Sequence, residues 1–123
     1  MYGLGVLGDK VEKFTGRIVK ATQYLKEKKE YSLADQLFRS GTSIGANCSE
    51  AISAVSRADF ANKLAIALKE ANETCHWIQV MFMAELVDKR TYESMKADAV
   101  EICKLLTTIQ KNTRLNIENK NNK

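Results

Sequence analysis

The sequence predicts an all-α protein that folds as an up-down-up-down antiparallel four-helix bundle. Proline is absent from the 123 residues, and the six glycines lie mainly near the N-terminus and in one cluster, so little interrupts long helices. Apolar residues recur at three- and four-residue steps along four segments, and no alternating strand pattern competes with them. Because only a few residues connect these segments, neighbouring helices should run antiparallel.

The first half of the chain is expected to form two of these helices. The first should cover residues 9–29, where apolar side chains recur on one face. The second should begin at Ser32, which forms a pattern with Asp35 that resembles a capping box, and it should end near Val55. Both apolar faces would then point into a common core.

The second half is expected to form the other two helices. Ser56 precedes Asp59 in the same arrangement and should cap a third helix of roughly 30 residues, which corresponds to about 45 Å. Thr91 is the predicted cap of the fourth helix. The apolar pattern fades toward the C-terminus, where the chain becomes polar.

One bundle should account for the whole chain. We expect a flexible leader over residues 1–8, a single four-helix bundle domain over residues 9–117 and a polar tail over residues 118–123. With 45% hydrophobic residues, the domain can build a sufficient core without staples. The sequence contains neither an apolar run long enough for a membrane span nor a signal-peptide pattern, so it predicts a cytoplasmic protein with no membrane partner.

Three cysteines, Cys48, Cys75 and Cys103, form an odd set without close spacing, which predicts reduced thiols and no disulfide framework. Heights estimated from the helical rise place them roughly 11, 27 and 20 Å from the end of the bundle that holds Ser56, in different layers. That separation argues against a shared zinc site and favours buried apolar cysteines. We expect no metal and no cofactor.

Three further patterns match enzyme motifs but lack the surrounding structure that each motif needs. Residues 3–8 satisfy GxGxxG without a preceding strand, and residues 41–45 satisfy GxSxG inside a helix instead of at a strand-to-helix turn. Glu73 and His76 have the ExxH spacing of di-iron bundles, but the chain has one histidine, so only subunit symmetry could complete that site. We therefore expect no catalytic residue and no enzymatic activity.

The segment from Ser40 to Ser49 is unusually rich in small residues for a helix. It includes Gly41 and Gly45, and each glycine costs roughly 1 kcal/mol in helix propensity. Close approach of two helices, either inside the bundle or between subunits, would offset this cost.

Three segments carry a resemblance to a known family: RSGTSIGANCSEA, RADFANKLAIALKEA and NETCHWI. They resemble the small four-helix bundle proteins known as the S23 ribosomal protein family, or 23S rRNA-intervening sequence proteins. The resemblance covers residues 31–109, and the SIGAN and KEANET segments make it specific. The chain departs from the commoner pattern at Cys75 and His76, where an acidic and an aromatic residue are more usual, and at Ala51, where glycine is frequent.

The resemblance implies an up-down bundle that assembles into homo-oligomers, with a ring-shaped homopentamer expected. Open reading frames of this family were first noticed inside insertions of ribosomal RNA genes. A related group serves as an accessory factor of retroelement reverse transcriptases and binds template RNA. No catalytic motif comes with either role.

Several polar residues of the second and third helices form a candidate structural polar network. They are Arg39, Asn47, Glu50, Lys69, Glu70 and Glu73. A hydrogen-bond network that sets helix register is the favoured interpretation, and a subunit contact or direct binding of a ligand or RNA remain as alternatives.

A modest net charge of +4 makes the distribution of charge more informative than its total. When the residues are divided by height, the whole excess falls at the end that holds the start of the first helix and the end of the fourth. The candidate nucleic-acid-binding residues at or next to this end are Lys10, Lys13, Arg17, Lys20, Lys111 and Arg114. Ordinary solubilising lysines are the competing interpretation.

Two functions from different classes follow. The first is an RNA-binding oligomer that recognises structured RNA through the basic end. The second is a protein-interaction scaffold, for example an adaptor for a reverse transcriptase. Large apolar groups around more than one face of the third helix, such as Trp77, Phe82 and Met83, further predict a buried surface between subunits.

Overall fold

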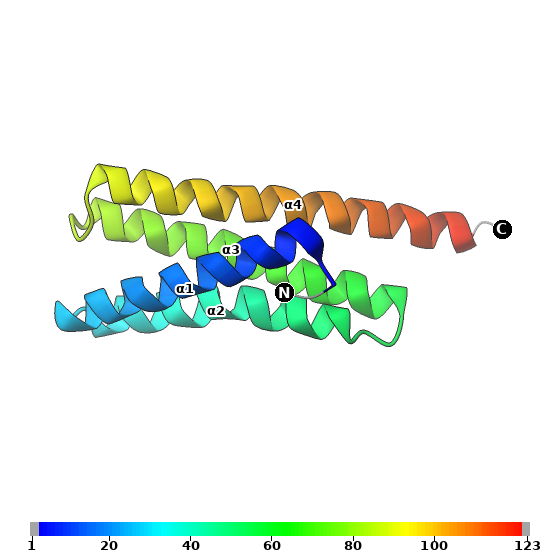
Figure 1. Cartoon of the computed structure of the whole chain (residues 1–123), viewed down its shortest axis with the longest axis horizontal. Coiled ribbons are helices and arrows are strands. Elements are labelled where there is room, and N and C mark those ends of the chain that lie inside the picture. The colour runs from blue at the N-terminus through cyan, green and yellow to red at the C-terminus, as the bar shows by residue number, and fades with distance from the viewer. Residues whose placement is uncertain (1–2, 122–123) are drawn as a thin grey trace.

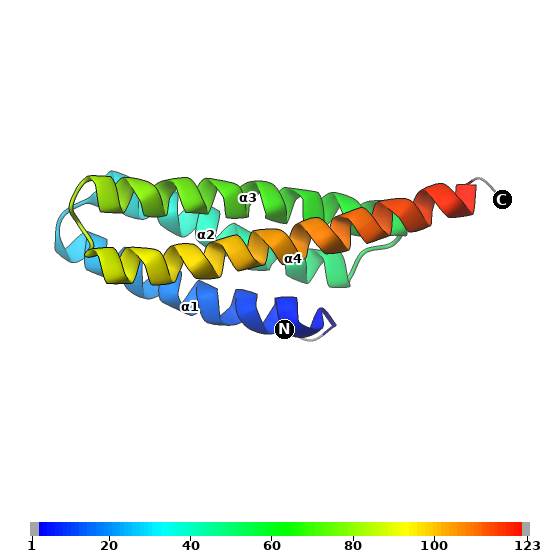
Figure 2. The ribbon, with the colours of Figure 1, turned by 90° about the horizontal axis from the view of Figure 1, so that it is seen from above.

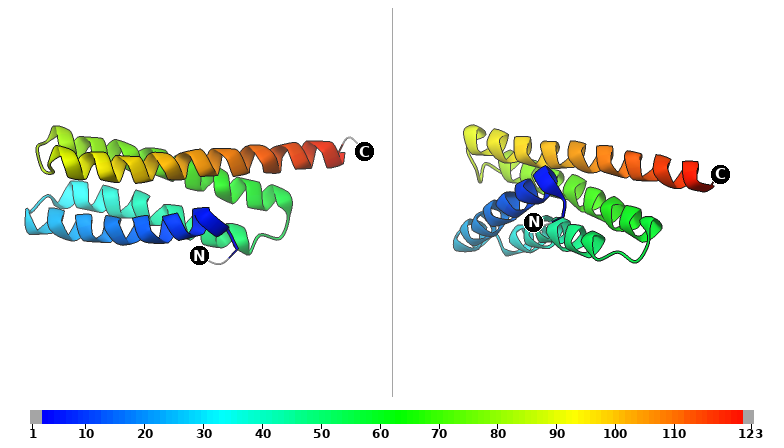
Figure 3. Two further views of the ribbon diagram at one scale, coloured as in Figure 1. Left: turned by 45° about the horizontal axis from the view of Figure 1, so that its top comes forward. Right: turned by 45° about the vertical axis from the view of Figure 1, so that its right-hand side comes forward.

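The computed structural model describes residues 3–121 and contains four helices in that range. They are α1 (Gly5–Glu27), α2 (Tyr31–Ile52), α3 (Arg57–Met83) and α4 (Lys89–Asn121). Consecutive helices run antiparallel, which confirms the expected four-helix bundle (Figures 1 and 2). The pair α1 and α2 forms one layer and the pair α3 and α4 the other (Figure 3). None of the helices in this range is long and apolar enough to span a bilayer.

The core lies where the apolar faces of the four helices meet. Its largest fully buried side chains include Phe14, Ile18, Leu37, Ile44, Leu64, Ile78, Ile102 and Leu106. The buried hydroxyls of Thr22, Ser40 and Thr74 each donate a hydrogen bond to a carbonyl one turn earlier in their own helix. These bonds satisfy the polar atoms that the core encloses.

Gly41 allows α2 to approach α1 closely. A Cβ added at Gly41 would lie 2.6 Å from Cγ2 of Ile18, which is closer than real carbon atoms pack. The predicted role of small residues in close helix packing is therefore confirmed at this position, and the contact lies inside one subunit. Gly16 differs, because a Cβ there would meet nothing within 4 Å.

The α1–α2 and α3–α4 connections lie at the same end of the bundle and use the same type of turn (Figure 1). Lys29 and Glu85 adopt left-handed backbone conformations, with φ of 62° and 61°. In both turns the next N–H donates a hydrogen bond of 2.9 Å to the carbonyl five residues before it. This is the Schellman pattern, which usually has glycine at the left-handed position.

The helix caps agree with the sequence at one position and differ at two. Ser56 caps α3 as predicted, because its hydroxyl accepts a hydrogen bond from the Asp59 N–H. The prediction of Ser32 as a cap is wrong, since α2 begins before that residue. Thr91 is also not the cap of α4. Its N–H donates to Asp88 Oδ1 at 2.7 Å, and this bond is the main cause of the lowered pKa of Asp88.

The ends of the bundle differ from the expected boundaries. α1 begins at Gly5, and Leu7 is buried, so the expected start at residue 9 is wrong by about one turn. The glycine-rich sequence suggested flexibility, but Leu7 extends the apolar stripe into the core and stabilises the extra turn. α4 continues through Asn121, so most of the predicted polar tail is helical. The remaining parts of the predicted leader and tail, residues 1–2 and 122–123, lie outside the described residues.

Candidate nucleic-acid interface

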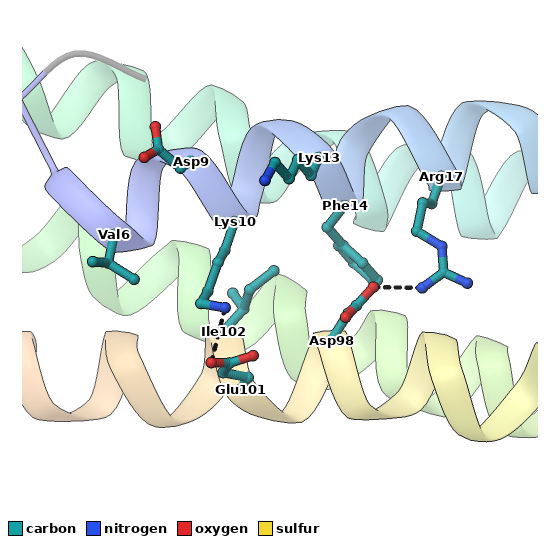
Figure 4. Close-up of a pocket in the computed structure, with 9 residues that line it drawn as sticks. All are labelled: Val6, Asp9, Lys10, Lys13, Phe14, Arg17, Asp98, Glu101 and Ile102. Atoms are coloured by element: carbon teal, nitrogen blue, oxygen red, sulfur yellow. Dashed lines mark hydrogen bonds and ion pairs between the residues drawn. The ribbon is translucent and has the colours of Figure 1, made fainter.

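The predicted basic stripe of α1 borders α4. Lys10, Lys13 and Arg17 line a groove of about 420 Å³ between the two helices (Figure 4). Lys20 lies one turn further along α1, beside a second groove that Arg17 also lines. The structure thus places the four predicted α1 residues on one side of the helix.

Two of these four cations form ion pairs within the subunit. Lys10 Nζ lies 2.9 Å from Glu101 Oε1, and Arg17 Nη1 lies 2.5 Å from Asp98 Oδ2. Figure 4 shows both pairs crossing from α1 to α4. Because their side chains are partly exposed, each pair stabilises the fold by about 1 kcal/mol or less. Their carboxylates nevertheless compete with any phosphate for the same cations.

The groove between α1 and α4 is electrically balanced. Its lining contains as many acidic as basic side chains: Asp9, Asp98 and Glu101 against Lys10, Lys13 and Arg17. The division of charge by height did not anticipate that Asp98 of α4 would lie beside Arg17. The groove itself is therefore a poor site for a polyanion.

Lys111 and Arg114 do not join the α1 stripe. Arg114 lines a groove between α4 and the first turns of α3, where the neighbouring side chains include Ala61 and Ala65. Lys104 lines the adjoining part of the same α3–α4 side, and Lys111 follows seven residues later on that side of the helix. The two predicted groups of cations therefore lie on different sides of the bundle: one lines the α1–α4 groove and the other lies along the α3–α4 side.

We call the side chains of Lys104, Lys111 and Arg114 the α4 cationic face. All three are exposed, and within residues 3–121 none of them takes part in an ion pair. The groove beside them is lined mainly by small and neutral residues: Ala58, Ala61, Asn62, Ala65, Asn72, Thr107, Thr108 and Gln110. Glu118 is the acidic residue in this lining. The seven- and three-residue spacing of the cations on one helix was the signal in the sequence that could have identified this face.

Arg39 is the centre of the candidate polar network. Its guanidinium lies 3.2 Å from Glu70 Oε2 and also pairs with Glu73 across the α2–α3 contact. Trp77 Nε1 donates a second hydrogen bond to Glu73 Oε1 at 3.3 Å. Glu73 is thus engaged by Arg39 and Trp77, and it is not held beside the exposed His76 as a metal ligand.

The other predicted members of this network lie apart from Arg39. Glu50 pairs with Lys63 at 2.9 Å, and this hydrogen bond raises the pKa of the partly exposed Lys63. Asn47 Nδ2 donates to the Ser43 carbonyl of its own helix at 2.9 Å. Lys69 is outside the ion pairs found among residues 3–121. Four of the six residues therefore take part in two separate cross-helix pairings: Arg39 with Glu70 and Glu73, and Glu50 with Lys63. Residues 3–121 contain no cluster of three or more His, Cys, Asp or Glu side chains that could hold a metal ion.

The three cysteines have two different environments. Cys48 is fully buried, and burial raises the pKa of its thiol to about 11, which matches the predicted apolar role. Cys75 and Cys103 are only half-buried, and both line the groove between α3 and α4. The prediction that these two residues lie in unrelated layers is wrong. Heights along the helix axes ignore the direction in which each side chain leans.

Most of the large apolar side chains on α3 pack against the other helices of the same chain. Ile78 and Met81 are buried, and the Phe82 ring stacks on Tyr92 of α4 with centroids 4.3 Å apart. Trp77 is half-buried beside the core, whereas Met83 is 73% exposed. The sequence argument for a second buried surface on α3 is weakened accordingly.

The fold and these surfaces define a class: a small antiparallel four-helix bundle with grooves between α1 and α4 and between α3 and α4. The chain belongs to the 23S rRNA-intervening sequence protein family, whose model matches residues 7–108. This confirms the resemblance carried by the three quoted segments.

One solved structure is similar over almost its whole length. It is a protein of unknown function from the S23 ribosomal protein family of Bacteroides thetaiotaomicron, with 50% sequence identity and a TM-score of 0.84. The match covers 86% of this chain and 99% of that chain. No curated protein matches. Lys104 lies inside the region that the family model matches, whereas Lys111 and Arg114 lie beyond it.

Proposed function

We propose that this protein is a non-enzymatic, homo-oligomeric bundle that binds structured RNA through the α4 cationic face. One observation carries the proposal: Lys104, Lys111 and Arg114 are exposed, share one side of α4 and stay outside the ion pairs of residues 3–121. A phosphate backbone is attracted most strongly by cations that no carboxylate already neutralises.

The predicted cations of α1 then divide into two groups. Lys10 and Arg17 hold α1 against α4 through Glu101 and Asp98, which favours a structural role. Lys13 and Lys20 lie outside these pairs and could add long-range attraction. They are secondary contributors in this proposal.

The character of the face favours recognition of RNA shape over recognition of sequence. Apart from Glu118, the side chains that line the groove beside the cations are small or neutral, and they include no aromatic ring on which an unpaired base could stack. Phosphate contacts along a folded RNA helix suit such a surface. A ring-shaped homopentamer, the assembly implied by the family resemblance, would repeat the face and add weak contacts from several subunits.

The test is a binding measurement with matched variants. The purified protein is titrated with a folded ribosomal RNA insertion hairpin at several salt concentrations, and an unrelated duplex of equal length serves as the control RNA. One variant combines Lys104→Gln, Lys111→Gln and Arg114→Gln. The matched variant combines Lys10→Gln, Lys13→Gln and Arg17→Gln and removes the same formal charge.

We expect the α4 variant to lose affinity by roughly tenfold or more and to show a flatter dependence on salt, because fewer counterions are released. The α1 variant should change affinity by less than about threefold, because two of its cations already have carboxylate partners. Light scattering on each variant checks that the oligomer is unchanged. Equal losses in both variants, or no binding by the wild type, would contradict the proposed interface.

A protein-interaction scaffold is the second candidate, for example an adaptor for a retroelement reverse transcriptase. The observation that favours it is on α2, where Tyr31 and Phe38 are 57% and 46% exposed and lie seven residues apart on one side. Binding to a protein partner that is insensitive to salt and lost in Phe38→Ser would favour this candidate over RNA binding.

A further inference from the structure

Two cysteines from different helices meet on the surface of the bundle. Cys75 of α3 and Cys103 of α4 line one groove, together with Asn72 and Lys104. The two thiols lie close enough that each is the main influence on the other's acidity. The Cys103 thiol donates a hydrogen bond of 3.5 Å to Oδ1 of Asn72, one turn before Cys75 on α3. Both cysteines are half-buried, so solvent reaches the pair.

The antiparallel arrangement makes the two side chains converge. Helical side chains lean toward the N-terminus of their own helix. The Cys103 sulfur contacts the Asn72 side chain, and Cys75 lies about 4.5 Å beyond Asn72 along α3 and leans back toward it. Because α4 runs the opposite way (Figure 1), the lean of the Cys103 side chain is toward Cys75. The offset between the two backbone positions is thereby reduced at the sulfur atoms.

The two thiols differ in acidity. The neighbouring Cys103 thiol, with help from the nearby charge of Lys96, lowers the pKa of Cys75 to about 7. The neighbouring Cys75 thiol and burial raise the pKa of Cys103. Near neutral pH a large fraction of Cys75 is therefore thiolate, while Cys103 keeps its proton. One nucleophilic thiolate beside one protonated thiol is the arrangement that thiol–disulfide exchange requires.

We propose that Cys75 and Cys103 form a reversible disulfide that links α3 to α4, with a small-molecule disulfide such as oxidised glutathione as the oxidant. The Cys75 thiolate attacks one sulfur of the small disulfide, forms a mixed disulfide and releases one small thiolate. Cys103 then loses its proton, attacks the Cys75 sulfur and releases the second small thiolate. The two protein thiols are oxidised, the small disulfide is reduced to two thiols, and the two protons end on those thiols. The thiol chemistry does not rest on RNA binding by the α4 cationic face.

The first test uses the intact, fully reduced protein. It is incubated with oxidised glutathione, denatured, alkylated and analysed by intact mass and tryptic peptide mapping. Lys89, Arg90 and Lys96 separate the two cysteines, so trypsin places them on different peptides. We expect one alkylated residue, Cys48, and a linked peptide pair that contains Cys75 and Cys103. Three alkylated cysteines, a stable glutathione adduct on Cys75 or a link between chains would overturn the proposal.

The second test assigns the two roles by conservative variants. Cys103→Ser keeps a hydroxyl donor but cannot resolve the mixed disulfide, so glutathione should stay on Cys75. In Cys75→Ser, the adduct on Cys103 should form roughly fivefold more slowly, because the higher thiolate fraction of Cys75 outweighs the lower nucleophilicity of its thiolate. Equal or reversed rates would overturn the assigned roles.

The third measurement asks whether the bond fits the native fold. Oxidised wild-type protein should unfold at a higher temperature than the reduced protein, and a reductant should reverse the shift. Cys103→Ser should show no shift, and Cys48→Ala should keep it. An oxidised protein that unfolds at the same or a lower temperature would show a bond at odds with native packing and would overturn the proposal.

Discussion

The hairpins α1/α2 and α3/α4 close with the same left-handed turn but differ in what lies between their helices. In α1/α2, Gly41 lies directly against Ile18, and Cys48 is sealed in the core. In α3/α4, small and polar side chains leave a groove on the surface, and Cys75 and Cys103 stay half-exposed along it. The first hairpin has no space for a larger side chain at Gly41, whereas the second keeps reactive and charged groups accessible.

This difference separates stability from function along the bundle. The close α1–α2 contact at Gly41 tolerates few substitutions. Side chains on the surface of the α3–α4 groove, such as Lys104, Lys111 and Arg114, can be replaced without disturbing the core. Substitutions in the first hairpin should therefore act on the free energy of unfolding. Substitutions in the second should act on binding and on thiol chemistry.

The largest effect on stability is expected for Gly41→Ala. Its Cβ would lie 2.6 Å from Cγ2 of Ile18, a branched side chain that cannot move aside cheaply. We expect the free energy of unfolding to fall by about 3 kcal/mol. Urea denaturation measures this change. Adding Ile18→Ala should reduce the extra cost of Gly41→Ala to below about 1 kcal/mol, because the clash is then absent.

Gly16→Ala is the matched control on α1. A Cβ at this position meets nothing within 4 Å, so only the helix propensity changes. The free energy of unfolding should rise by about 1 kcal/mol. If both glycine substitutions acted in the same direction, the close α1–α2 seam would not be the feature that distinguishes the first hairpin.

The sequence predicted the packed hairpin better than the grooved one. Apolar periodicity needs only the helical repeat, so the bundle, its antiparallel order and the role of Gly41 could be inferred from local spacing. The predictions of Ser32 and Thr91 as caps were wrong because several polar residues lie near each helix start and spacing alone does not choose among them. Glu30 precedes α2 without a capping hydrogen bond from its side chain, whereas Asp88 accepts the Thr91 N–H at the start of α4.

The candidate site depended on information that local spacing does not contain. The helical rise gives the height of each residue along its helix, but it does not show which side of α4 faces α1. The rotation of α4 about its axis brings Asp98 next to Arg17 and places Arg114 along α3. It also decides that Cys75 and Cys103 share a groove. Contacts between helices set these relations, and a single sequence does not specify them.

The second prediction concerns the buried thiol of the first hairpin. Burial raises the pKa of Cys48 from 9.0 to about 11, so the unfolded chain loses this proton at lower pH than the folded protein. The contribution of Cys48 is fully present below pH 9.0 and is lost as the pH rises toward about 11. At a pH close to 11, the free energy of unfolding of the wild type should have fallen by about 2 kcal/mol more than that of Cys48→Ala.

Urea denaturation of both proteins at a series of alkaline pH values measures this difference. Lysines and tyrosines titrate in both proteins, so their effects cancel in the comparison. The Cys75→Ser variant is a useful second reference because its site is half-exposed. Parallel pH profiles for wild type and Cys48→Ala would contradict the sealed environment assigned to Cys48.

The smallest effect tests what the two hairpins share. Lys29 and Glu85 hold φ values of 62° and 61°, which cost an L-residue roughly 1 kcal/mol relative to glycine. Lys29→Gly and Glu85→Gly should each raise the free energy of unfolding by about 1 kcal/mol, less the entropy that glycine adds to the unfolded chain. Thermal and urea denaturation of both variants measure the gain. Because the hydrogen bonds of the turns are equivalent, the two gains should be similar. A gain in only one hairpin would show that packing around the turn, and not its backbone strain, controls its stability.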